Sequence, residues 1–273
     1  MQLDGALITI ERRRTTGCID LAVVFVREHF AGVLLMTAMF AVPTVVLGWA
    51  LMSYVDIFTS WMVLLLFACV SPFLGAVLVS STGRRVFGDA FDVGEGFRSL
   101  KSRFIQLLGY VIVTRALSTI LSCLILPPLL LICRYGFITE ILYLENTPRK
   151  KASTRLSNLM SSVNSDMVGR GLLVFAFYAV MVFGLGILVE LASNLLFGIP
   201  ILWNRLTVLN GRNWELIFFD PRFCTVAHVL LWVFYPLIRL TWFFCYLDVR
   251  IQKEGWDVEL DYRIEAQRLS ELG

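Results

Sequence analysis

Long apolar runs alternate with charged intervals along this chain, and the alternation predicts a helical membrane protein. Six runs have about the 20-residue length that a helix needs to cross the hydrocarbon core of a bilayer. They cover residues 30–54, 59–80, 104–126, 129–145, 171–196 and 223–247. Because lipid offers no hydrogen-bond partner to an exposed backbone, we expect these runs to be helices rather than open strands.

A shorter amphipathic segment precedes each pair of apolar runs. In 19–30, 87–104 and 152–167, apolar residues recur at helical spacing and charged residues occupy the other positions. Such segments are typical of helices that lie at a membrane surface. The predicted fold is therefore an all-α membrane protein with six transmembrane helices arranged as three hairpins, each preceded by an amphipathic interfacial helix. The middle hairpin is expected to turn at Pro127-Pro128.

The same pattern divides the chain into three parts and predicts its orientation. We expect an N-terminal segment with an interfacial helix (1–29), a six-span membrane domain (30–247) and a charged tail (248–273). Most Lys and Arg residues outside the spans belong to one side of this topology. The opposite side carries Arg205, Arg212 and Arg222. The positive-inside rule then places both termini in the cytoplasm.

Composition supports a membrane protein and offers no sign of catalysis. Hydrophobic residues make up 58% of the chain and charged residues 16%, against about 25% charged in soluble domains. The histidines, His29 and His228, are expected near opposite membrane faces, so a His-based metal site is not expected. No phosphate-binding loop, GxSxG motif or HExxH motif occurs. We therefore expect no enzyme, no cofactor and no nucleic-acid partner.

Charged residues inside the predicted spans are the candidate functional residues. Arg115, Arg134 and Arg239 lie within apolar runs, where each costs about 2.5–3.5 kcal/mol unless it faces the bundle interior. Depth along the spans suggests two interhelical ion pairs, Glu140–Arg239 and Glu190–Arg134.

Two interpretations of these arginines remain open. They form either a ligand site for an anion such as a lipid phosphate, or ion pairs that fix helix packing.

Two motifs follow the fourth and sixth runs. Leu144-Glu145-Asn146 is followed by Ala152, Arg155 and Leu159, and a second run extends from Tyr246 to Glu259 with sequence YLDVRIQKEGWDVE. They resemble motifs of the glycerophosphoryl diester phosphodiesterase membrane-domain-like family. The chain departs from that pattern at Leu156, where the family usually has Ser. The resemblance implies a six-helix domain in a prokaryotic plasma membrane, with no catalytic role established for the domain.

The closing motif has two interpretations of its own. Its charged residues either dock a partner protein or anchor a juxtamembrane helix at the lipid headgroups; they are Arg250, Lys253, Glu254, Asp257 and Glu259. The sequence favours a non-catalytic scaffold or complex subunit, with anionic lipid as a further expected ligand. The alternative is a transporter or lipid-handling protein that uses an Arg-lined intramembrane cavity.

Overall fold

The computed structural model describes residues 14–55, 60–86, 90–120, 135–145, 148–161, 164–198 and 219–254. Within these ranges every regular element is a helix, so the predicted all-α class is confirmed. The helices are α1 (Thr15–Glu28), α2 (Phe30–Tyr54), α3 (Ser60–Val86), α4 (Val93–Ile120), α6 (Ile138–Tyr143), α7 (Arg149–Met160), α8 (Asn164–Phe197) and α11 (Pro221–Glu254).

Four of the described helices are long and apolar enough to cross a membrane. They are α2, α3, α8 and α11, and they correspond to the first, second, fifth and sixth predicted runs. The protein is therefore membrane-embedded. Of the predicted fourth run, the structure describes only 135–145, which contains a turn at Gly136-Phe137 and then α6. At 6 residues, α6 extends about 9 Å and does not cross a bilayer by itself.

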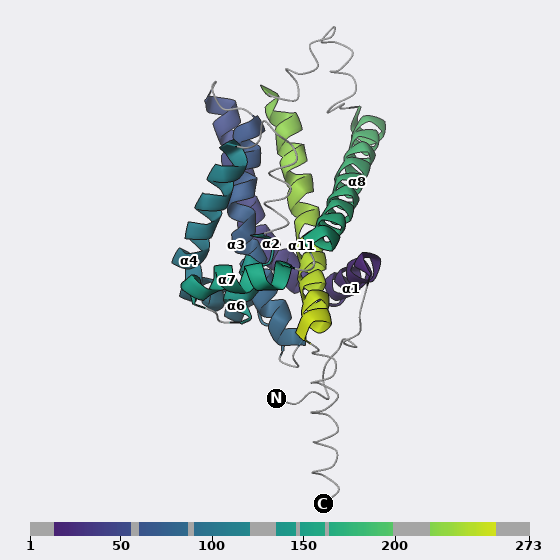
Figure 1. Cartoon of the computed structure of the whole chain (residues 1–273). Coiled ribbons are helices and arrows are strands. Elements are labelled where there is room, and N and C mark those ends of the chain that lie inside the picture. Colours follow the sequence, from purple (N-terminus) through teal and green to yellow (C-terminus); the bar gives the residue numbers. More distant parts are fainter. Residues whose placement is uncertain are drawn as a thin grey trace, which may run out of the picture.

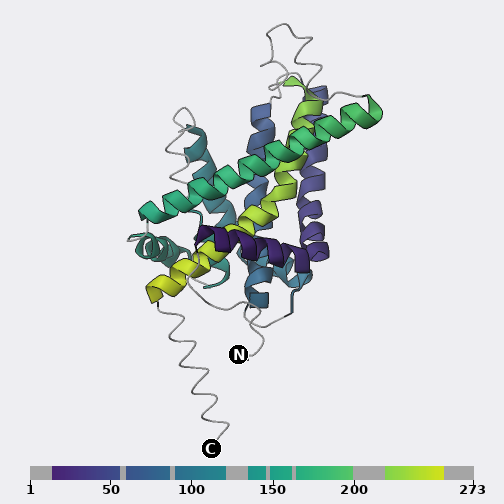
Figure 2. The same cartoon turned by 90° about the vertical axis from the view of Figure 1, so that its right-hand side faces the viewer.

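α2 and α3 run side by side, whereas α1 and α7 lie across one end of the bundle (Figures 1 and 2). The last turns of α11 reach the same end. In Figure 2, α8 crosses α11 diagonally. We call this end the basic end, because Arg84, Arg98 and Lys151 are exposed there.

The three segments predicted as amphipathic helices are helical, but with other boundaries than expected. His29, with φ −112° and ψ 27°, separates α1 from α2. In the second segment, α4 begins at Val93 and passes through a kink at Arg103 (φ −126°, ψ 18°) before it enters the third predicted run. The third segment divides between α7 and the first turn of α8, so the prediction of one helix over 152–167 is wrong.

Local side-chain bonds explain where α11 and α4 begin. The Asp220 side chain accepts hydrogen bonds from the backbone N–H groups of Arg222 (2.8 Å) and Phe223 (3.2 Å), and Pro221 occupies the first helical position. This is the usual N-terminal cap of a helix. Asp92 similarly accepts the N–H of Gly94 at 2.8 Å, immediately before α4 becomes regular.

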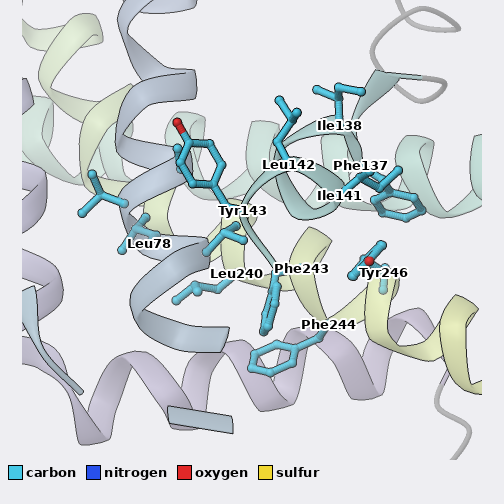
Figure 3. Packing of buried hydrophobic residues seen from close by; sticks show 14 of the residues in the cluster. Leu78, Phe137, Ile138, Ile141, Leu142, Tyr143, Leu240, Phe243, Phe244 and Tyr246 are labelled. Carbon is cyan, nitrogen blue, oxygen red and sulfur yellow. The ribbon is translucent and has the colours of Figure 1, made fainter. Parts of the chain in front are cut away.

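The main core forms where α3, α6 and α11 meet (Figure 3). Phe137 packs there against Tyr246, with ring centroids 5.3 Å apart, and against Trp242 at 5.2 Å. By contrast, only 6% of the residues in the most apolar stretch of α8 are buried within the chain, against 44% in that of α3. The outer surface of α8 is thus available to lipid.

Candidate functional site

An ion pair in the bundle interior joins α6 to α11. Arg239 Nη1 lies 2.7 Å from Glu140 Oε1, and the two side chains are 9% and 0% exposed. The structure therefore brings together one of the two pairs that the sequence suggests. Removing either partner would leave the other charge buried without compensation, which is far more costly than breaking an exposed pair.

Tyr235 and a glycine of α3 complete the surroundings of Arg239. The Tyr235 hydroxyl lies close to Ser71 of α3. A Cβ atom at Gly75 would lie 2.8 Å from Arg239 Nε and 2.9 Å from the Tyr235 hydroxyl. A side chain at this position would therefore have to displace the guanidinium or the phenol, which pack closely against the glycine.

A second predicted arginine, Arg115 of α4, approaches the same place. Tyr235 lies within electrostatic range of both Arg115 and Arg239. Arg134 lies outside the described residues, so the proposed Glu190–Arg134 pair does as well. Glu190 itself is 6% exposed on α8.

Several polar atoms around this ion pair are buried without a hydrogen bond in the described part of the chain. They include both carboxylate oxygens of Glu140, Nη2 of Arg239 and Nε1 of Trp242, one turn from Arg239 on α11. The 2.7 Å contact between Glu140 and Arg239 is thus an ion pair by distance without the angles of a hydrogen bond. Buried polar groups are normally satisfied, so these atoms are candidates for contact with water or a polar ligand.

A second polar network lies at the basic end and centres on Glu145. Its carboxylate accepts hydrogen bonds from Arg155 Nε (2.9 Å) and Nη2 (3.2 Å), and from the Tyr246 hydroxyl (2.7 Å). Arg250 Nε lies 3.7 Å away. Two guanidinium groups and a phenol therefore surround this largely buried carboxylate and compensate its charge.

The network continues on the other side of α11 through Asp248. Arg170 Nη1 donates a hydrogen bond to Asp248 at 2.6 Å, and Gln252 donates another at 2.7 Å. Arg170 also bonds Asp166 of its own helix at 2.8 Å. Further along, Lys253 Nζ donates to the backbone carbonyl of Asn158 at 2.8 Å. The end of α11 is therefore tied to α7, to α8 and to the segment after α6.

These contacts bring the two sequence motifs together. They also change the interpretation of the second motif, which extends from Tyr246 to Glu259. Arg250 has a side chain only 15% exposed, and Lys253 bonds α7, so both are used within the chain. The side chain of Glu254 and residues Asp257 and Glu259 lie outside what the structure describes, and docking through them stays a prediction.

Glu145 and Arg155 are motif residues, but no pattern in the sequence pairs them. Asp166 and Arg170 belong to neither motif. Tyr246 and Glu145 are 101 residues apart in the chain. Helical periodicity gives no sign that two residues so far apart are hydrogen-bonded.

Among the described residues, no three His, Cys, Asp or Glu side chains gather as metal ligands. His228 is buried and accepts a hydrogen bond from Trp232 Nε1 at 3.0 Å, which is a packing role. No family model, curated protein or solved structure matches this chain. The family resemblance therefore stays a prediction that depends on the two motifs.

Proposed function

We propose that this protein is a non-catalytic scaffold or complex subunit of a prokaryotic plasma membrane. It spans the membrane six times, with α4 beyond Arg103 in the third span and residues 129–145 in the fourth. Both termini are cytoplasmic, so the basic end faces the cytoplasm. This end serves as a platform for a partner protein and for anionic lipid.

The polar network of Glu145 and Asp248 is the observation that carries this proposal. It fixes three helices and the segment after α6 against one another through charge-assisted hydrogen bonds, which are the stronger and more directional kind. A side chain such as Arg170, 10% exposed, is held in one position rather than sampling solvent. A platform of fixed shape at the membrane surface suits the binding of partners, because little ordering is needed on association.

The distribution of cations supports the orientation. Basic residues of the described helices collect at the basic end, where the positive-inside rule expects the cytoplasm. They include Arg84, Arg85, Arg98, Lys101, Arg155, Arg170, Arg250 and Lys253.

Purification of the full chain in a mild detergent, with mass spectrometry of co-eluting proteins, tests the scaffold role. We expect a stoichiometric partner that is lost in the double variant Asp257→Ala/Glu259→Ala. The matched control is Asp261→Ala/Glu265→Ala, which removes the same charge from the same tail outside the motif and should retain the partner. The absence of any stoichiometric protein, or equal loss in both variants, would contradict the proposal.

A transporter or lipid-handling role is the second candidate. It is favoured by the convergence of Arg115 and Arg239 on Tyr235 and by the buried polar atoms without hydrogen bonds around Arg239. Reconstitution into vesicles, followed by measurement of anion flux and of lipid translocation between leaflets, tests it. Transfer rates equal to those of protein-free vesicles would exclude this candidate.

A further inference from the structure

The exposed side of α4 changes from basic to apolar within one or two helical turns. Arg98 has a side chain 77% exposed, and Lys101 and Ser102 are also exposed. Only a few residues further along the helix, Ile105 is 80% exposed. Charged and apolar side chains that are both uncovered and lie so close together are typical of the level at which headgroups meet hydrocarbon.

The neighbouring end of α3 adds another cation to the basic part. Glu95 contacts both Arg84 and Arg98, and Arg84 Nη1 lies 2.9 Å from Glu95 Oε2. The carboxylate therefore holds two guanidinium groups near each other. With Lys101 one further turn along α4, the described residues of this patch include three cations, Arg84, Arg98 and Lys101, against the acids Glu95 and Asp92.

The apolar part continues along α4 beyond the kink at Arg103. Ile112 and Val113 are 59% and 61% exposed, about 10 Å further along the helix axis than Ile105. Phe104 stacks on Phe73 of α3 with ring centroids 5.2 Å apart, so α4 is in apolar contact with α3 at the level of Ile105.

We propose that one anionic phospholipid binds to this surface. Its phosphate contacts Arg84, Arg98 and Lys101, and an acyl chain lies along Ile105 and Ile112. The lipid site rests on the proposed function, because it requires α4 beyond Arg103 to be the third span.

Charge complementarity selects an anionic lipid over a zwitterionic one. A guanidinium group binds phosphate oxygens through parallel N–H donors. A zwitterionic lipid would bring a second, cationic group to a patch that already has an excess of cations. Each Lys or Arg near an anionic surface is worth about a fivefold change in affinity.

Native mass spectrometry of the full chain in a neutral detergent measures this preference. The probes are short-chain phosphatidylglycerol and phosphatidylcholine, each titrated separately. We expect tighter binding of phosphatidylglycerol, with at least a fivefold loss of affinity in Arg98→Gln/Lys101→Gln. The control Arg14→Gln/Lys151→Gln removes the same charge from exposed positions, one immediately before α1 and one on α7, and should change the affinity less than twofold.

Equal binding of the two lipids, or equal loss in the two double variants, would overturn the proposed site. The second result would mean that the basic end attracts anionic lipid only as a diffuse charge. The apolar part is tested by Ile112→Asn, which should weaken retention of a long-chain phosphatidylglycerol more than that of a short-chain one. Retention of both chain lengths unchanged would place the acyl chain elsewhere and refute this part of the proposal.

The lipid site and the partner-binding role can be refuted separately, because different variants affect them. Asp257→Ala/Glu259→Ala should leave the preference for phosphatidylglycerol intact, because these residues belong to the tail and not to α3 or α4. Loss of the lipid site would leave a co-eluting partner in place, and loss of the partner would leave the lipid preference in place.

Discussion

The contribution of the Glu140–Arg239 ion pair to stability can be measured by replacing its two residues singly and together. Replacement of either residue by Gln leaves the other charge buried, at 0% exposure for Glu140 and 9% for Arg239. With charge centres about 4 Å apart and an effective dielectric constant of about 20, the lost attraction is about 4 kcal/mol. Loss of one partner of a buried pair typically destabilises a protein by about 3–5 kcal/mol. We expect each single variant to lose free energy of unfolding in this range.

The double variant Glu140→Gln/Arg239→Gln separates the pair from general packing. Because no charge remains buried, its loss of stability should be smaller than the sum of the two single losses by at least about 2 kcal/mol. Unfolding by sodium dodecyl sulfate in mixed micelles, followed by circular dichroism, gives the three free energies.

Additive losses in this cycle would refute the assignment of an energetically coupled pair. The exposed pair Glu95–Arg98 provides the comparison. The Arg98 side chain is 77% exposed, so its coupling to Glu95 should be below about 1 kcal/mol.

Two further outcomes are expected. Trp232→Phe should cost about 1 kcal/mol more in detergent unfolding than Trp242→Phe, because only the first change removes a hydrogen bond of the described part of the chain, the bond to His228; the reverse order would refute this. Gly75→Ala should lower the unfolding temperature and the yield of folded protein, because its Cβ would lie 2.8 Å from a buried guanidinium nitrogen; a wild-type unfolding temperature would contradict that geometry.

The sequence predicted the helical class and the four long spans because apolar length is a direct consequence of bilayer thickness. It also suggested Glu140 and Arg239 as partners, since depth along two spans can be counted at a fixed rise per residue. The prediction of one helix over 152–167 was wrong because the amphipathic pattern of α7 and that of the first turn of α8 share a phase. Periodicity alone did not reveal the break between them.

The contacts of the polar network at the basic end could not be predicted from helical periodicity, for a different reason. Glu145, Arg155 and Tyr246 belong to segments far apart in the chain, and their contact depends on how α7 and α11 pack. Two recognisable motifs can mark such residues as important. Only the packed helices reveal which carboxylate faces which guanidinium group.

The length of α11 has a mechanical consequence. Its 34 residues extend about 51 Å, well beyond a hydrocarbon core of about 30 Å, so one rod carries Arg239 inside the bundle and Tyr246 at the basic end. The two residues are seven apart and project from nearly the same side of the helix. Pro236 precedes both, so no proline interrupts the rod between them. A rotation of α11 about its axis that displaced Arg239 from Glu140 would therefore also move Tyr246 relative to Glu145, so the ion pair inside the bundle and the network at the basic end are mechanically coupled through this helix.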